Sequence, residues 1–303
     1  MRPVYRDEPC RTALTRVRNM RFKWSLNPYM GCVHRCTFCF VRAFERLADR
    51  PSDARYGTSI RVKTNVVDVL RREVGRRSWA REQVVVGTAT DPYQPAEGHF
   101  RLTRGALAVL ADARTPVGII TRGPLIVRDV DVLQTLAGRA ELGVTFSIPT
   151  LDPDIWRQTE PGTAPPAKRL RALRTLVDAG IDASVGMAPI LPGLSDDPGK
   201  LADVVRAARD AGATSVWTNV LYLRPGTREH FLDRLAHDWP ELLPMYERLY
   251  RGRAYVRPEV VEPVRARVRA LARDVGLRDR RPTPIRPTPE AEAAVQQLAL
   301  PGW

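Results

Sequence analysis

Three cysteines lie close together in a chain that has few others. Cys32, Cys36 and Cys39 fall within eight residues, and the 303-residue sequence contains one further cysteine, Cys10. Clustered thiols in such a chain indicate a metal or cluster site rather than a disulfide framework. A closed structural site normally has four protein ligands, so three thiolates predict a metal that keeps one coordination position open.

The residues behind this cysteine loop alternate between short β-branched runs and amphipathic stretches. Continuous apolar runs such as 84–89 are typical of strands covered on both faces. Strands alternating with helices of this length predict a parallel sheet with right-handed crossovers. We expect strands at 22–26, 84–89, 117–121, 141–148, 181–187 and 215–220, and helices at 37–49, 65–77, 103–112, 124–136, 165–179, 198–211 and 227–235.

The chain divides into four expected regions. Residues 1–23 read as a basic, irregular N-terminal arm, and residues 24–238 hold the six β/α units. Residues 239–279 read as a helical C-terminal extension, with helices at 242–251 and 259–275. Residues 280–303 read as a proline-rich linker and tail, with a short helix at 290–300.

Polar residues follow several of the expected strands. Parallel sheets bind their ligands at the carboxyl ends of the strands, so these residues should gather at one rim with the cysteine loop. The candidates are Thr90, Asp91, Tyr93, Gln94 and Glu97 after the second strand, Arg122 after the third, and Ser147 and Glu160 at and beyond the end of the fourth.

The motifs Asn27-Pro-Tyr-x-Gly-Cys-x-His-x-Cys-x-Phe-Cys39 and Asp91-Pro-Tyr-Gln-Pro-x-Glu97 carry a family resemblance. The Cys-x3-Cys-x2-Cys spacing resembles the cluster loop of the radical S-adenosylmethionine (SAM) superfamily. The flanking residues resemble its branch related to spore photoproduct lyase, also called DNA repair photolyase-like. The resemblance covers roughly residues 24–225 and implies a partial (β/α)6 parallel barrel with a helical C-terminal extension.

The resemblance also implies two cofactors and a reaction. The three thiolates would hold three irons of a [4Fe–4S] cluster, and SAM would chelate the fourth. Reductive cleavage of SAM would give a 5′-deoxyadenosyl radical that abstracts hydrogen from the substrate. The electron would come from an external donor of the flavodoxin or ferredoxin type, and the protein's part is to position the cofactors and exclude side reactions.

Further positions carry over from the resemblance residue by residue. Phe38 and Phe40 match aromatics beside the adenosyl group, and Thr90 matches a hydroxyl residue that contacts the cofactor. Arg122 stands where the lyase has a cofactor-contacting lysine, and a cation there would pair with the methionine carboxylate. Ser147 matches a serine near the end of the fourth strand.

Two acidic residues have both a cofactor role and a structural alternative. Asp91 could cap the cofactor, or its side chain could bond its own backbone in a rigid turn. Glu160 could form a rim pair with Arg169 near the adenosyl ribose, or the two could form a surface ion pair.

One position departs from the lyase pattern. The lyase returns a hydrogen to its product radical from a cysteine, and Thr88 occupies that position here. A hydroxyl O–H bond is much stronger than a thiol S–H bond, so the resemblance does not extend to this step. Tyr93 is a speculative alternative hydrogen donor.

Other functions remain open from the residues alone. A structural zinc completed by His34 or Cys10 would make the chain a non-catalytic nucleic-acid-binding protein, although His34 fits better as a residue that orders the loop. The radical enzyme could also act on a peptide or a small metabolite. The net charge of +14 favours a nucleic-acid partner, unless it reflects an arginine-rich composition.

The sequence also bears on location. It has no run long enough and apolar enough for a transmembrane helix, and its charged N-terminus does not resemble a secretory signal. With so few cysteines, we expect a cytoplasmic protein with no membrane partner.

Overall fold

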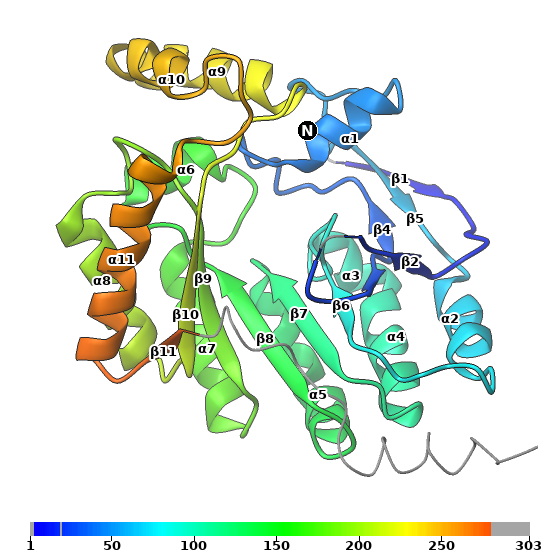
Figure 1. Ribbon diagram of the computed structural model, residues 1–303. Helices are drawn as coiled ribbons and strands as arrows, with labels where there is room; N and C mark the ends of the chain where they lie inside the picture. The colour runs from blue at the N-terminus through cyan, green and yellow to red at the C-terminus, as the bar shows by residue number, and fades with distance from the viewer. Residues whose placement is uncertain (1–2, 19, 280–303) are drawn as a thin grey trace, which may run out of the picture.

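The computed structural model describes residues 3–18 and 20–279 and is built around one open, mostly parallel sheet (Figure 1). Six strands lie in the sheet in the order in which they occur in the chain. They are β3 (Trp24–Leu26), β6 (Val84–Val86), β7 (Val117–Thr121), β8 (Leu142–Ser147), β9 (Ala183–Ile190) and β10 (Ser215–Val220).

Each of these strands pairs in parallel with the next, so their carboxyl ends meet at one rim. Short strands extend both edges: β2 (Leu14–Arg16) runs antiparallel to β3, and β11 (Arg278–Asp279) runs parallel to β10. The two edges do not pair with each other, so the sheet is open. The predicted α/β fold with six β/α units is confirmed, and it forms a partial rather than a closed barrel.

Helices between the strands cover the outer face of the sheet (Figure 1). Their apolar residues recur at helical spacing and join the strands in one hydrophobic core. These helices are α2 (Val66–Val74), α4 (Leu102–Asp112), α5 (Val130–Ala137), α7 (Pro166–Asp178) and α8 (Pro198–Asp210), and α11 (Pro258–Asp274) packs against α8 and β10. Among the described residues, no helix combines the length and apolar character that a bilayer crossing requires.

The N-terminal region differs from the expected irregular arm. Residues 4–7 form β1 (Val4–Asp7), which pairs with β5 (Ser59–Val62), and β5 pairs in turn with β4 (Tyr29–Met30) just before the cysteines. The side chains of β1 are all exposed, so the strand has no apolar alternation that a sequence pattern could reveal. Backbone pairing places this segment in the small second sheet.

Several shorter elements also differ from expectation. The single helix expected at 124–136 is a 3-10 turn, η1 (Pro124–Asp129), followed by α5. The break falls at Asp129, whose fully buried carboxylate pairs with Arg104 and Arg128. Two short helices, α3 (Pro95–Phe100) and α6 (Pro153–Thr159), were not expected, and each begins with a proline at its first helical position.

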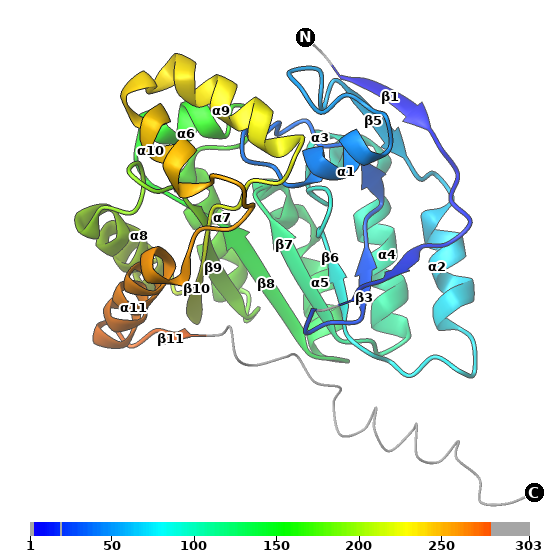
Figure 2. The ribbon, with the colours of Figure 1, turned by 45° about the horizontal axis from the view of Figure 1, so that its top comes forward.

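The C-terminal part forms a lobe beside the rim. It contains α9 (Thr227–Asp238), η2 (Pro240–Leu242) and α10 (Leu243–Leu249), and Figure 2 shows these helices across from α1 (Val41–Leu47). Cys36 and Phe38 belong to the apolar cluster beneath this lobe, together with Leu223, Phe231 and Tyr246. The lobe therefore packs directly on the cysteine loop. The expected proline-rich tail, 280–303, lies outside the described residues.

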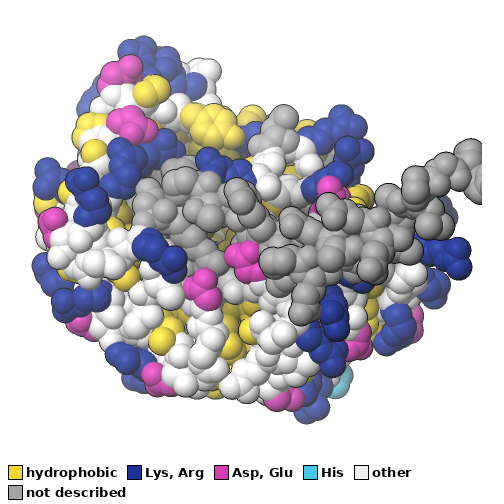
Figure 3. All heavy atoms as spheres, turned by 60° about the horizontal axis from the view of Figure 1, so that its bottom comes forward, with side chains coloured by type: hydrophobic (Ala, Val, Ile, Leu, Met, Phe, Trp, Pro, Cys, Tyr) yellow, Lys and Arg dark blue, Asp and Glu magenta, His cyan; other side chains and the backbone are white. Residues whose placement is uncertain are grey.

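Basic side chains are not confined to the rim. Figure 3 views the lower side of Figure 1, and Lys and Arg side chains are scattered there among Asp and Glu. The net charge by itself therefore does not locate a binding surface.

Candidate functional site

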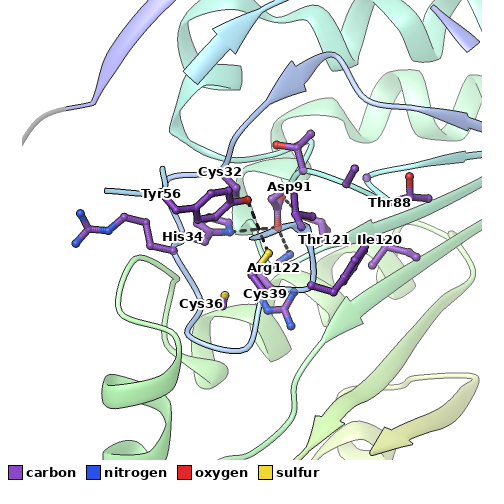
Figure 4. A pocket seen from close by; sticks show the side chains of 16 residues that line it. Cys32, His34, Cys36, Cys39, Tyr56, Thr88, Asp91, Ile120, Thr121 and Arg122 are labelled. Atoms are coloured by element: carbon purple, nitrogen blue, oxygen red, sulfur yellow. Dashed lines mark hydrogen bonds and ion pairs between the residues drawn. The ribbon is translucent and has the colours of Figure 1, made fainter. Parts of the chain in front are cut away.

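The three clustered cysteines line one cavity at the carboxyl ends of the strands (Figure 4). Its walls come from the cysteine loop, from residues 87–91 after β6 and from residues 120–122 at the end of β7. It holds about 490 Å³ of empty space, including space continuous with solvent. The part of it that water-sized molecules can occupy is about 80 Å³, several times the space that one water needs, so the cavity has room for more than a single ion.

Close backbone packing holds the cysteine loop in place. Gly31 has a positive φ of 84°, which allows a tight turn before Cys32. A Cβ on Gly57 would lie 2.3 Å from the carbonyl oxygen of Cys32, and a Cβ on Gly162 would lie 2.3 Å from that of Val33. Glycine is needed at both positions because any side chain would push the loop away.

Gln94 links the loop after β6 to the cysteine loop. Its side chain is fully buried, and its Oε1 accepts a hydrogen bond from the backbone N–H of Val33 over 3.1 Å. Its Nε2 donates to the carbonyl oxygen of Gly31 over 3.2 Å and to Oγ1 of Thr90 over 2.9 Å. Thr90 Oγ1 donates to the same Gly31 carbonyl over 2.7 Å. Gln94 and Thr90 thus fix the backbone on both sides of Cys32.

Asp91 is the centre of a second buried network. Its carboxylate accepts hydrogen bonds from Thr121 Oγ1 over 2.7 Å and from the backbone N–H groups of Arg122 and Tyr93 over 2.6 and 2.9 Å. His34 Nδ1 lies 3.4 Å away. Burial raises the pKa of Asp91, but attraction to His34 and these hydrogen bonds outweigh it and lower the pKa to about 2.

His34 lies between Asp91 and the first cysteine. The ring is buried, and burial alone would lower its pKa, but the charges of Cys32 and Asp91 and hydrogen bonds to both raise it. These contacts agree with the expected role of His34 in ordering the loop. Asp91 also accepts a hydrogen bond from the backbone two residues further on, which is the rigid turn that we expected as the alternative role of Asp91.

Burial disfavours the charged form of the clustered thiols. Burial raises the pKa of Cys36 and of Cys39, so a free thiolate is costly there and a bound cation would offset the cost. In a [4Fe–4S] cluster each thiolate binds a different iron, so three thiols on one loop suit three of its irons.

Arg122 places a guanidinium at the wall of the cavity. Its Nε donates to Glu160 Oε1 over 2.6 Å, its Nη2 donates to the carbonyl oxygen of Ala188 over 3.1 Å, and its charged group lies 5.6 Å from the ring centre of Phe38. Burial lowers the pKa of Arg122, but the negative charges of Cys36 and Glu160 raise it by more. The net pKa is raised, so the side chain stays charged.

The pair of Glu160 and Arg169 is buried rather than exposed. Both side chains are 0% exposed, and Arg169 Nη1 donates to the two carboxylate oxygens of Glu160 over 3.2 and 3.0 Å. The alternative of a surface ion pair is therefore wrong. Glu160 is shared between two arginines, and this sharing fixes the position of Arg122.

The structure gathers most of the other expected site residues. Phe40, Thr90, Asp91 and Arg122 line the cavity with the cysteines. Phe38, Ser147 and Glu160 lie behind this wall, where Ser147 contributes its carbonyl oxygen to Arg169 over 2.8 Å.

Three residues of the polar loop after β6 have different surroundings. Thr88 lines the cavity, and its Oγ1 accepts a hydrogen bond from Asn27 over 3.1 Å. Tyr93 is part of the hydrophobic core and is not among the lining residues, which removes the support for Tyr93 as a hydrogen donor. Glu97 is fully buried and accepts from Tyr29 and from the backbone of Thr103, so it stabilises the start of α4 instead of facing the rim.

Sequence reasoning missed Tyr56 and Arg42. Tyr56 is buried in the cavity wall, and its hydroxyl lies 3.7 Å from Cys39 Sγ. The guanidinium of Arg42 covers its ring at 4.7 Å and donates to the carbonyl oxygen of Cys36. The sequence pattern indicated neither residue: Tyr56 lies in a loop, and Arg42 falls on the face of the expected 37–49 helix opposite Phe40, Phe44 and Leu47.

The fourth cysteine does not join the other three. The backbone N–H of Cys10 donates to Asn65 Oδ1 over 2.8 Å, and its carbonyl oxygen accepts from Asn65 Nδ2 over 3.0 Å. Cys10 thus lies beside the start of α2 and is not among the cavity-lining residues.

Comparison with known proteins gives relatives and a shared fold. Uncharacterized proteins of Mycobacterium bovis and Mycobacterium tuberculosis are 39% identical over 296 residues, covering 96% of this chain and 86% of the relatives. A mutant of spore photoproduct lyase with bound AdoMet and dinucleoside spore photoproduct superposes with a TM-score of 0.67. It is 14% identical, with 89% of this chain and 79% of that chain covered, so this likeness shows the fold.

A family model described as the radical SAM superfamily matches residues 26–205, which is more than half of the chain and includes the whole cysteine loop. Members of this superfamily use a [4Fe–4S] cluster and SAM, in agreement with the three-thiol cavity. The extent of the match shows that the chain belongs to the radical SAM superfamily and is an enzyme of that class.

Proposed function

We propose that Cys32, Cys36 and Cys39 hold a [4Fe–4S] cluster in this cavity and that SAM binds beside it. The observation that carries the proposal is the convergence of three thiols, two of them buried, and a charged arginine on one cavity within the matched family region. A cluster held by these thiolates would supply one-electron reduction of SAM, and through it hydrogen-atom abstraction from the substrate.

The protein's own residues would position the reactants. Arg122 presents a fixed positive charge suited to the carboxylate of the methionine moiety, because Glu160 and the Ala188 carbonyl anchor the other side of its guanidinium. Phe40 offers an apolar surface in the cavity wall for the adenosyl group. Gln94 and Thr90 would hold the backbone of the cysteine loop in position around the cluster.

Nucleic acid is the substrate class that we favour. The net charge of +14 would attract a polyanion, and the lyase that shares this fold was solved with a dinucleoside photoproduct. Thr88 lines the cavity at the position where the lyase resemblance implies a cysteine. Its O–H bond is too strong to return a hydrogen atom readily, so we propose a reaction that differs from dimer reversal in its last step. A small one-electron carrier protein would supply the electron.

Anaerobic reconstitution with iron and sulfide tests the assignment. We expect about four irons per chain, visible absorption from iron–sulfur charge transfer, and formation of 5′-deoxyadenosine when SAM and a strong reductant are added. Zinc uptake without iron, or a loaded cluster that never yields 5′-deoxyadenosine, would overturn the proposal. Cys10→Ala is the matched control, since Cys10 is bound only to the α2 region.

A further inference from the structure

A row of aromatic rings runs from the cavity wall to the surface. Phe40 lines the cavity, and its ring centre lies 6.2 Å from that of Tyr222, just after β10. Tyr222 stacks on Tyr255 with centres 5.1 Å apart and planes 18° from parallel. Tyr255 is 56% exposed, so the stack ends in a side chain largely open to solvent.

Two loops carry this row and are joined to the cysteine loop. Tyr222 and Tyr255 form an isolated antiparallel bridge, and Leu223 donates from its backbone to the carbonyl oxygen of Ala254 over 2.7 Å. A few residues later, Thr227 Oγ1 donates to the carbonyl oxygen of Cys39 over 3.0 Å. The stack is therefore held at a fixed position relative to the cavity.

The same loops carry positive charge and contain no acidic residue of their own. Residues 211–228 and 248–258 contain no Asp or Glu. Arg224, Arg251, Arg253 and Arg257 are exposed, and none of them forms an ion pair with an acid in the described part of the chain. Arg224 instead donates to the hydroxyl of Tyr255 over 3.3 Å. By contrast, exposed arginines beside the cavity on the α1 side, such as Arg46 and Arg55, are paired with carboxylates.

Charge and stacking together define the ligand that would fit. An open aromatic face stacks a flat ring, and arginines without acid partners attract phosphates. Base stacking requires that the ring be accessible, which excludes a base inside a duplex. A peptide would need carboxylates for the arginines and would gain less from a flat, open ring.

We propose that Tyr255, stacked on Tyr222 and surrounded by Arg224, Arg251, Arg253 and Arg257, binds an unpaired base of single-stranded nucleic acid and guides the strand to the cavity. This inference rests on the proposed function for its biological meaning, but binding can be measured without it.

The test uses the reconstituted, full-length protein without reductant and a fluorescein-labelled single-stranded oligonucleotide. Tyr255→Leu should weaken binding by about 5- to 100-fold, the usual effect of losing one stacked base. Tyr255→Trp should preserve binding, because it keeps an aromatic face. Tyr5→Leu removes another exposed ring, which packs on Phe100 in a different part of the surface, and should bind like the unchanged protein.

Two further measurements separate stacking from simple charge attraction. An oligonucleotide containing 2-aminopurine should lose fluorescence on binding, and Tyr255→Leu should reduce that loss. Heparin carries negative charge but no bases, so its affinity should fall with Arg253→Gln and stay the same with Tyr255→Leu. Equal binding by Tyr255→Leu and the unchanged protein, or equal losses for heparin and oligonucleotide, would overturn the inference.

Failure of this inference can be told apart from failure of the cluster assignment. Cys36→Ser should lose iron yet still bind the oligonucleotide, because the stacking row does not include Cys36. A protein that forms 5′-deoxyadenosine but binds oligonucleotide independently of Tyr255 would keep the proposed function and reject the stacking site. A protein that binds the oligonucleotide through Tyr255 but takes up no iron would keep the stacking site and reject the proposed function.

Discussion

Arg122 and Glu160 form a hydrogen-bonded ion pair of 2.6 Å in which the carboxylate is completely buried and the arginine reaches the cavity wall. Glu160 has a second partner in Arg169, which is itself buried. The three side chains connect the end of β7, the segment after α6 and the start of α7. The charge that faces the cavity thus depends on an acid that does not line it.

Glu160→Gln should therefore destabilise the fold as well as weaken SAM binding. Removing one member of a buried ion pair leaves the other charge without compensation, at a cost of about 3–5 kcal/mol. Urea unfolding measures this loss. Asp112→Asn breaks an exposed pair with Arg139 and should cost less than about 1 kcal/mol. Equal stability of the two variants would show that the buried pair does not have this role.

Serine at any one of Cys32, Cys36 or Cys39 should abolish stable cluster binding, because each thiolate would be the sole protein ligand of one iron. Iron and sulfide content per chain, with the visible spectrum, gives the measurement. Cys10→Ala should retain full iron content. Retention of iron by any of the three serine variants would contradict the assigned ligand set.

Gln94→Leu should destabilise the cysteine loop without removing a ligand. The change leaves the buried N–H of Val33 without its partner, which costs about 1–3 kcal/mol. We expect lower stability to urea and faster loss of iron on exposure to a chelator. Gln134→Leu is the matched control, because that side chain makes its hydrogen bond to Ala179 in an exposed position. Identical iron loss from both variants would exclude a positioning role for Gln94.

His230 on α9 should make stability depend on pH. Burial and then the charge of Arg42 lower its pKa from 6.5 to about 4, with Arg234 acting in the same direction and Asp233 and Asp53 opposing it. Below about pH 6.5 the unfolded chain binds a proton at this ring that the folded chain does not. The free energy of unfolding therefore decreases as the pH falls from 6.5 toward 4.

The unfolding free energies of the unchanged protein and His230→Gln should be compared at about pH 7 and about pH 5. Between these pH values the unchanged protein should lose about 1–2 kcal/mol more unfolding free energy than the variant. This range is set below what the full pKa shift would give, because the ring keeps some access to solvent. A difference that does not change with pH would mean that His230 titrates normally.

Much of the fold and the gathering of the three cysteines at one cavity could be predicted from local sequence. The strands from 84 onward are apolar runs bounded by turns, and the three cysteines have a spacing that few other sites share. The two short N-terminal strands could not be predicted, because β1 is exposed and is defined by its backbone partner β5.

Sequence patterns also did not predict the residues that hold the cavity walls in place. The polarity of Glu97 suggested a residue at the rim, but its partners are Tyr29, 68 residues away, and the first turn of α4. Tyr56 contacts Cys39 from a loop without periodicity. These roles depend on contacts between distant segments, and a single sequence does not reveal which distant segments meet.

The bond from Thr227 to the Cys39 carbonyl joins residues 188 positions apart, and it bears on when the cofactor can enter. The cysteine loop leaves the ribosome early, but its supports are synthesised over the next two-thirds of the chain, through Tyr56, Gln94, Gly162 and finally Thr227. Until then the thiols belong to a nascent chain without a complete cavity. Cluster delivery should therefore be a late event that follows synthesis of Thr227 and completion of the cavity.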